Sequence, residues 1–124
     1  AQTRKLVKQN DTVVVIGGGG KSGVLCLYEA KKKSGVKTIA IDYSDSAIER
    51  LKKLSFVDEI IQGDARAAVS IFEKVSKSTQ GKLADVVINV ANIPDTEMSC
   101  VLSTKKNGIV YLFSMATSFT RAAL

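Results

Sequence analysis

The feature that most constrains the fold is a run of glycines that directly follows a short apolar segment. Residues 12–16 read TVVVI, and residues 17–23 read GGGGKSG. A continuous β-branched run of this length is typical of a strand that is buried on both faces of a parallel sheet. Because glycine adopts unusual φ/ψ values without steric cost, the segment predicts a tight turn from that strand into a helix.

The glycine turn also predicts a phosphate site. Two spacings fit, Gly18-x-Gly20-x-x-Gly23 and Gly17-x-x-Gly20-x-x-Gly23, and we prefer the second because Gly17 directly follows the strand. Glycine lets a pyrophosphate approach the backbone, and the following helix offers free N–H groups and the positive end of its dipole. The predicted phosphate-binding residues are Gly17, Gly18, Gly19, Gly20, Lys21, Ser22 and Gly23.

A P-loop is the nearest alternative to this site, because Gly20-Lys21-Ser22 matches the end of that motif. The motif needs a glycine five positions before Gly20, and Val15 occupies that position inside the strand. Hydrolysis of ATP or GTP is therefore disfavoured. Lys21 either contacts phosphate or lies in solvent at the start of the helix.

Short β-branched runs alternate with helical stretches along the chain. The predicted strands cover residues 12–16, 38–41, 57–61, 85–91 and 109–113. The predicted helices cover residues 21–33, 44–54, 66–77 and 95–103, with Ser44 as an N-cap and a turn at Asn107-Gly108. This order is typical of an α/β fold, a doubly wound parallel sheet (Rossmann fold) with strand order 3-2-1-4-5. Such sheets bind ligands beyond the carboxyl ends of their strands.

Asp42 follows the second predicted strand, 19 residues after Gly23. A carboxylate at this position accepts hydrogen bonds from the hydroxyls of an adenosine ribose and repels the 2′-phosphate of NADP. Neither Tyr43 nor Ser44 supplies an arginine to offset that repulsion, so the predicted cofactor is NAD, with Tyr43 beside it. The alternative role of Asp42 is to start the turn into the next helix.

The ends of the other strands supply the remaining predicted contacts. Asp64 and Ala65 follow the third strand, where a carboxylate and a backbone N–H can bind the edge of the adenine ring. Asp64 is also a candidate N-cap for the next helix. The nicotinamide half of the cofactor is predicted to lie between the ends of the fourth and fifth strands, which are Val90, Ala91, Asn92, Phe113, Ser114 and Met115.

The composition excludes several other classes of protein. With 124 residues, of which 45% are hydrophobic and 24% charged, the chain (residues 1–124) fits one soluble domain. The net charge of +6 comes from lysines at helix ends and turn edges without interleaved aromatics, so we expect no nucleic acid partner. No apolar run reaches the ~20 residues of a membrane span, and there is no signal-peptide pattern. Two distant cysteines without any histidine predict no metal site and a reduced, cytoplasmic chain.

From the glycine turn through Asp42 to the fifth strand, the chain resembles the cofactor domain of medium-chain dehydrogenases. Three segments resemble the L-erythro-3,5-diaminohexanoate dehydrogenase family more narrowly: GGGGKSG at residues 17–23, NIPDTEM at 92–98 and FSMATSF at 113–119. The last two are the more specific, because many dehydrogenases share the first. The resemblance implies oxidative deamination of a small diamino acid, 3,5-diaminohexanoate, to 5-amino-3-oxohexanoate in lysine fermentation, with NAD as the hydride acceptor. The resemblance also implies the cofactor contacts that were predicted above at the glycine turn and at the ends of the strands.

Dehydrogenases of this type are longer than this chain and have a catalytic domain beyond the cofactor domain. We therefore expect a fragment that binds NAD without converting substrate, and we assign no catalytic residue. Glu97, Ser114 and Thr117 are polar candidates for facing the substrate, although helix-surface and capping roles are favoured for them. The oligomeric state is open, with a homo-oligomer among the alternatives.

Two other classes of protein share parts of this pattern. A nucleotide-sensing module, such as the regulatory domain of potassium-transport systems, has a glycine turn, an acidic end of its second strand and a GDA-like segment after its third. The SMATSF segment and the long excursion over residues 66–82 argue against it. A methyltransferase that uses S-adenosylmethionine has similar carboxylates, but it usually carries an acidic residue just before its glycine turn, where this sequence has VVVI.

Overall fold

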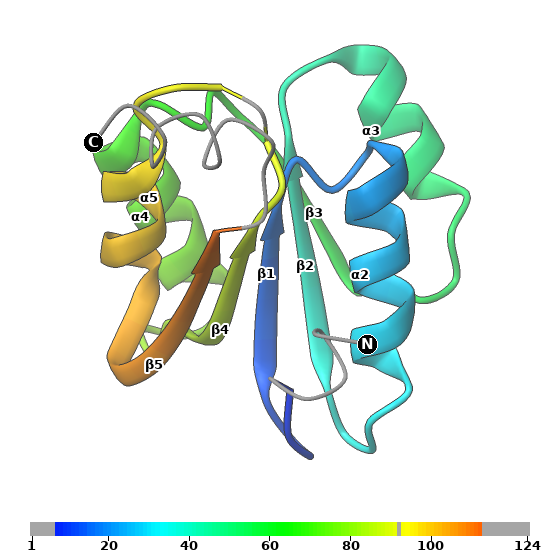
Figure 1. Cartoon of the computed structure of the whole chain (residues 1–124), viewed down its shortest axis with the longest axis horizontal. Coiled ribbons are helices and arrows are strands. Elements are labelled where there is room, and N and C mark those ends of the chain that lie inside the picture. The colour runs from blue at the N-terminus through cyan, green and yellow to red at the C-terminus, as the bar shows by residue number, and fades with distance from the viewer. Residues whose placement is uncertain (1–6, 92, 113–124) are drawn as a thin grey trace, which may run out of the picture.

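The computed structural model describes residues 7–91 and 93–112, which form a parallel sheet with helices on both faces (Figure 1). The strands are β1 (Thr12–Ile16), β2 (Lys37–Asp42), β3 (Glu59–Gln62), β4 (Ala84–Asn89) and β5 (Thr104–Leu112). Every neighbouring pair is parallel, and the strand order is β3-β2-β1-β4-β5. The predicted doubly wound α/β sheet with this strand order is confirmed.

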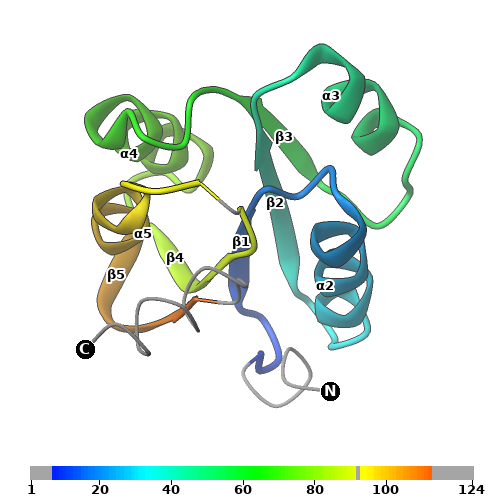
Figure 2. The same ribbon diagram turned by 45° about the horizontal axis from the view of Figure 1, so that its top comes forward.

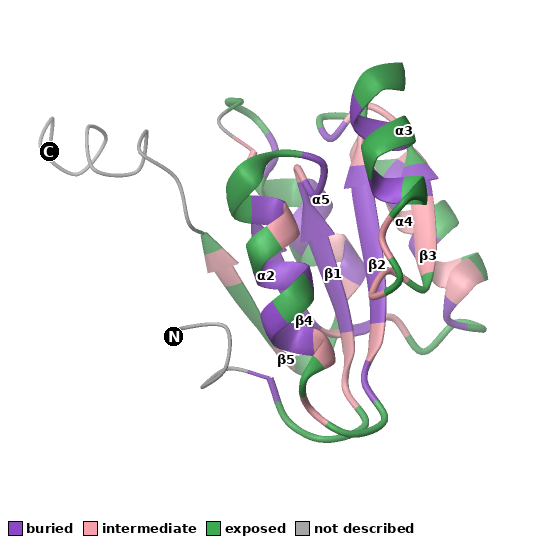
Figure 3. Cartoon of the chain, turned by 90° about the vertical axis from the view of Figure 1, so that its right-hand side faces the viewer, coloured by how far each residue is buried: buried purple, intermediate pink, exposed green. Residues whose placement is uncertain are grey.

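The side chains of β1 divide the core into two layers. The helices are α2 (Lys21–Lys31), α3 (Asp45–Lys52), α4 (Ala68–Ser78) and α5 (Glu97–Ser103). Val13 and Val15 pack in the layer that contains the buried side chains of α2 and α3. Val14 and Ile16 pack in the layer that contains those of α4 and α5. Strand β1 is therefore buried on both faces, as Figure 3 shows, and this explains its unbroken β-branched run.

The predicted helices are all present, with bounds that differ by one or two residues. α2 ends two residues earlier than predicted, and α5 starts two residues later. Ser44 is the N-cap of α3 as predicted, because its Oγ accepts a hydrogen bond from the Ala47 N–H at 3.2 Å. The N-cap of α4 is Ala67, so the prediction of Asp64 as that N-cap is wrong.

The strand bounds differ more, and the differences have local causes. β3 starts at Glu59 rather than at residue 57, because the preceding residue turns back onto β2. β4 ends at Asn89, so Val90 and Ala91 follow the strand instead of belonging to it. β5 starts five residues before its predicted beginning, at Thr104, and it contains the predicted turn at Asn107 as an irregularity with φ 67°. The register of β4 and β5 shifts across this point.

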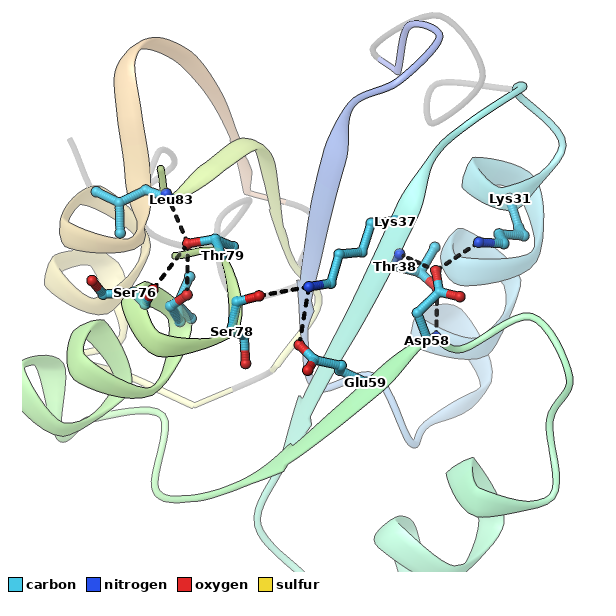
Figure 4. Close-up of polar contacts among 10 residues, drawn as sticks. Lys31, Lys37, Thr38, Asp58, Glu59, Ser76, Ser78, Thr79 and Leu83 are labelled. Atoms are coloured by element: carbon cyan, nitrogen blue, oxygen red, sulfur yellow. Dashed lines mark hydrogen bonds and ion pairs between the residues drawn. The ribbon is translucent and has the colours of Figure 1, made fainter. Parts of the chain in front are cut away.

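A hydrogen-bonded carboxylate joins three elements at the edge of the sheet where β2 and β3 begin (Figure 4). Asp58 Oδ2 accepts hydrogen bonds from Lys31 Nζ at 2.6 Å and from the Thr38 N–H at 2.8 Å. Burial raises the pKa of the Asp58 carboxyl, but the hydrogen bonds from Lys31 and Thr38 outweigh this effect and hold the pKa below its usual value. The ionised form of Asp58 therefore stabilises the fold.

The same edge carries a second polar link, between β2 and α4. Lys37 Nζ donates a hydrogen bond to the Ser78 carbonyl at 2.5 Å and lies 3.4 Å from Glu59 Oε2 (Figure 4). Just after α4, Thr79 Oγ1 accepts a hydrogen bond from the Leu83 N–H at 2.9 Å and so fixes the turn into β4. These contacts lie where the strands begin. They do not involve the opposite edge of the sheet, where the strands end.

The substitution Asp58→Asn tests the role of this carboxylate. We expect it to lower the free energy of unfolding by about 1 kcal/mol at neutral pH, because hydrogen bonds to a half-exposed charge are partly screened. The folded-state pKa is lowered, so the stabilisation is present above the unfolded-state pKa and disappears as the pH falls through the folded-state pKa. Urea unfolding of the wild type and of Asp58→Asn at neutral and at acidic pH measures whether their free energies of unfolding become equal as the pH falls. Glu73→Gln on the exposed face of α4 is the control, and a difference independent of pH would contradict the account.

Candidate functional site

The carboxyl ends of the strands meet at one edge of the sheet, which lies at the top of Figure 1 and comes forward in Figure 2. A cavity of about 290 Å³ lies at this edge. The loops that follow β1, β2, β3 and β4 each contribute to its wall. Its lining residues are Gly17, Ile41, Asp42, Tyr43, Gly63, Asp64, Ala65, Arg66, Ala91 and Ile93.

The glycine turn is held against β2 by its own backbone. The N–H groups of Gly17 and Gly18 both donate to the Ile41 carbonyl, at 2.8 and 3.1 Å. Gly17 has φ +85°, a conformation that L side chains rarely adopt, and a Cβ there would lie 2.9 Å from the Ala91 nitrogen. A Cβ on Gly23 would overlap the Gly17 carbonyl oxygen. Both glycines are therefore required by the fold itself.

Gly20 differs from the other glycines of the turn. A Cβ at Gly20 would have as its nearest neighbour the Gly17 carbonyl oxygen, 3.8 Å away, so it would make only an ordinary van der Waals contact. Gly20 is also the N-cap of α2, and it has no side chain to bind the free N–H groups of the first helical turn. An anion can approach the backbone here and accept those hydrogen bonds. Gly17 and Gly23 are thus constrained by the fold, whereas Gly20 is not.

Asp42 fixes the position of the glycine turn and also lines the cavity. Its Oδ2 accepts a hydrogen bond from the Gly19 N–H at 2.8 Å, and its Oδ1 accepts one from the Tyr43 N–H at 2.8 Å. Each carboxylate oxygen has a second lone pair, so Asp42 can accept further hydrogen bonds from a ligand. Tyr43 is 69% exposed at the rim of the cavity.

Arg50 is a residue of the site that the sequence did not predict. Its Nε donates to the Gly19 carbonyl at 3.0 Å, so Arg50 and Asp42 hold the backbone of the same glycine. The periodicity of α3 contains a signal for this contact: Ala47 lies against Gly19, and Arg50 is three residues further along the same helix face. Through this contact α3 helps to hold the glycine turn beside the cavity.

Asp64 and Ala65 lie at the cavity as predicted, but the Asp64 carboxylate already has a partner. Oδ1 accepts hydrogen bonds from the Arg66 N–H at 2.9 Å and from Arg66 Nε at 3.2 Å, and Oδ2 accepts one from Arg66 Nη2 at 3.2 Å. The side-chain and backbone hydrogen bonds from Arg66 lower the pKa of Asp64. The Ala65 carbonyl accepts a hydrogen bond from Ser99 Oγ, which ties this loop to α5.

The residues after β4 have different positions. Ala91 lines the cavity, and its N–H donates to Asn89 Oδ1 at 3.0 Å. Val90 packs against the core layer of α2 and α3 and does not line the cavity. Ile93, which we did not predict as a site residue, also lines the cavity, as does Ile41. The predicted contacts Asn92, Phe113, Ser114 and Met115 lie outside the described residues.

Other kinds of site are not found in the described part of the chain. Residues 7–91 and 93–112 contain no group of His, Cys, Asp and Glu side chains that could hold a metal ion. Over the same residues, no helix has the length and apolar character to cross a membrane. Burial raises the pKa of the Cys100 thiol to about 11, so this cysteine is not an activated nucleophile. Glu97 is exposed at the start of α5.

The sheet order and the glycine turn after β1 together define the class of fold, which is that of a Rossmann domain. A solved structure named AibC aligns with 94% of the chain at a TM-score of 0.77 and 24% identity, and the chain covers 31% of it. A mycobacterial protein, Rv1454c, solved in complex with NADPH, aligns with 90% of the chain at a TM-score of 0.72 and 23% identity, and the chain covers 33% of it. These identities concern the fold alone.

Sequence comparison gives a narrower result. The chain is 41% identical over its whole length to the L-erythro-3,5-diaminohexanoate dehydrogenase of Acetoanaerobium sticklandii and 42% identical to that of Fusobacterium nucleatum. The resemblance that the sequence motifs predicted is therefore confirmed. The chain spans 37% and 36% of the length of these two relatives. No protein-family model matches the chain.

Two glycine substitutions distinguish Gly23, where a Cβ would overlap the backbone, from Gly20, where it would not. We expect Gly23→Ala to lower the free energy of unfolding by about 1–3 kcal/mol, because its Cβ overlaps the Gly17 carbonyl. Gly20→Ala is the matched control, and its effect should stay below about 1 kcal/mol, because the new Cβ makes only an ordinary contact and the remaining cost is that of alanine at an N-cap. Urea unfolding followed by circular dichroism measures both. Equal destabilisation by the two substitutions would show that the turn is not packed in this way.

Proposed function

We propose that this chain is the NAD-binding domain of a longer dehydrogenase that oxidatively deaminates L-erythro-3,5-diaminohexanoate to 5-amino-3-oxohexanoate. The observation that carries the proposal is the similarity over the whole chain to two dehydrogenases of that name. In the overall reaction, NAD accepts a hydride from the carbon that bears the 3-amino group, and water replaces the nitrogen, which leaves as ammonia. The chain would supply the cofactor site for this reaction, and the rest of the longer enzyme would supply the catalytic groups.

The cavity and the adjacent start of α2 offer the hydrogen-bond donors, the carboxylate and the apolar surface that an adenine dinucleotide needs. The free N–H groups at the start of α2 would donate hydrogen bonds to the pyrophosphate, and Gly20 has no side chain to block its approach. Asp42 would accept hydrogen bonds from the adenosine ribose, and the cavity beside it would receive the adenine. When bound, NAD supplies the hydride acceptor. The residues of this chain bind it, orient it and keep the glycine turn in place.

Asp42 favours NAD over NADP in this proposal, because a carboxylate at the ribose repels a 2′-phosphate. Arg50 reduces that preference, since its guanidinium binds the same glycine as Asp42 and can attract a phosphate. The structural neighbour Rv1454c is complexed with NADPH, but at 23% identity its likeness to this chain concerns the fold. We therefore propose NAD as the cofactor, with the Asp42 carboxylate as the group that selects it.

The remaining features are consistent with a cytoplasmic enzyme that acts on a small molecule. Cys26 and Cys100 are both free and buried, as expected in a reducing compartment. We expect neither nucleic acid nor a membrane as a partner, and a homo-oligomer is the assembly that we would examine first. A sensing module and a methyltransferase are the alternatives that the same glycine turn allows, and ligand binding distinguishes them.

Calorimetric titration of the protein with NAD, NADP, ATP and S-adenosylmethionine tests the nucleotide site. We expect NAD to bind most tightly and Gly20→Val to abolish its binding, because the larger side chain fills the open position where the pyrophosphate approaches. The variant should keep the circular dichroism spectrum of the wild type. Tighter binding of ATP or of S-adenosylmethionine would refute the dehydrogenase proposal.

The substrate is tested on a longer enzyme that contains this chain. NADH formation from L-erythro-3,5-diaminohexanoate, with release of one ammonia for each NADH, is the expected result. A set of simple alcohols and monoamino acids serves as the control. Faster turnover of any of these would refute the proposed substrate without affecting the NAD site.

Replacement of Asp42 by Ala tests the ribose contact and the role of Arg50 together. We expect NAD binding to weaken by about 1–3 kcal/mol through the loss of charge-assisted hydrogen bonds. NADP binding should become tighter at the same time, because the Asp42 carboxylate no longer repels the 2′-phosphate while Arg50, which binds the Gly19 carbonyl, can attract it. The double variant Asp42→Ala, Arg50→Ala should lose this gain. Unchanged NAD affinity in Asp42→Ala would show that this carboxylate is not the ribose ligand.

A further inference from the structure

The guanidinium of Arg66 lies at the cavity in a fixed orientation. Arg66 is two residues after Asp64, and its Nε and Nη2 donate to the two carboxylate oxygens, each at 3.2 Å. The Arg66 backbone N–H binds the same carboxylate at 2.9 Å, so the side chain and the main chain are held by one group. A bidentate pair of this kind fixes the plane of the guanidinium as well as its position.

The surroundings of Arg66 show which part of the cavity it borders. The side chains of Ile41, Ala91 and Ile93 give the cavity an apolar wall, and Arg66 is the cationic residue among its lining residues. Asp64 raises the pKa of Arg66 most strongly, and Asp95 and Tyr43 add to the effect. The Arg66 side chain lines the cavity and is 58% exposed, so a ligand can reach it.

Asp64 has little capacity left for a ligand. An ionised carboxylate offers about four acceptor sites, and Arg66 occupies three of them with its backbone N–H, Nε and Nη2. The expectation that Asp64 itself binds the edge of the adenine ring therefore competes with an existing, nearly complete set of hydrogen bonds. The face of the Arg66 guanidinium, in contrast, carries no hydrogen-bond donors and remains available for stacking.

We infer that Arg66 binds the adenine ring in this cavity by stacking its guanidinium plane on it, and that Asp64 is a positioning residue that holds this plane. The apolar side chains that line the cavity would contact the remainder of the base. The inference rests on the proposed function, because it assigns the base-binding residue of the same nucleotide site. Arginine planes stack on aromatic rings through dispersion and cation–π attraction.

The test uses Arg66→Ala, Arg66→Lys and Asp64→Asn, titrated calorimetrically with NAD, AMP and nicotinamide mononucleotide. We expect Arg66→Ala to weaken NAD and AMP roughly 5- to 30-fold, as removal of a stacked cation does. Arg66→Lys should lose most of the same affinity, because lysine keeps the charge but has no plane. Nicotinamide mononucleotide, which lacks adenine, should bind all variants equally. Asp64→Asn should weaken AMP less than Arg66→Ala does.

The controls separate stacking from a phosphate contact and from failure of the proposed function. Lys53→Ala, which removes an exposed cation outside the cavity, should leave all three affinities unchanged. If Arg66 contacts phosphate instead of the base, Arg66→Lys will retain the wild-type affinity for AMP, and this result would overturn the inference. Equal NAD binding by wild type and Arg66→Ala would overturn it as well. A wild-type protein that binds no dinucleotide would overturn the proposed function and this inference together.

Discussion

The hydrogen bond from the Gly19 N–H to the Asp42 carboxylate is the contact on which the geometry of the site depends. It joins the end of β2 to the turn that connects β1 with α2. Arg50 holds the carbonyl of the same glycine from α3, so β2 and α3 both hold this residue of the turn. With the turn fixed in this way, α2 begins at the end of the sheet where the cavity lies. Asp42 therefore has an architectural role that is separate from any contact with a ligand.

The sequence predicted the fold well, because its strongest signals are local and unambiguous. TVVVI can be a strand buried on both faces, and the side chains of β1 do pack in two separate core layers. The glycine turn marks where the first strand ends, and Ser44 marks where α3 begins. The least accurate prediction was the start of β5. There the Asn107-Gly108 pair forms an irregularity inside the strand, and a local turn signal cannot distinguish this arrangement from a hairpin-like turn.

The site was predicted only in part, and the reason is physical. Asp42 ends β2, and Asp64 and Ala91 follow β3 and β4, so the topology alone brings them to one edge of the sheet. Arg50 and Arg66 belong to segments after those strands, and their contacts depend on side-chain reach across the turn. Arg66 was not predicted, because the sequence pattern favoured Asp64 as the residue that binds the adenine ring. Only the hydrogen bonds between the two show which of them has a free surface.

The placement of β1 at the centre of the sheet has a consequence for how the chain folds as it is synthesised. One edge of β1 pairs with β2, which follows after a single helix. The other edge pairs with β4, and the Thr12 N–H that donates to Asp85 is 73 positions away from it. A nascent chain that has completed β1, β2 and β3 therefore exposes an unpaired backbone edge of β1, whose side chains from Val13 to Ile16 are apolar, until β4 emerges. Such an edge is a template for wrong pairing with another chain, so the ribosome-bound intermediate is the state in which this domain most needs a chaperone.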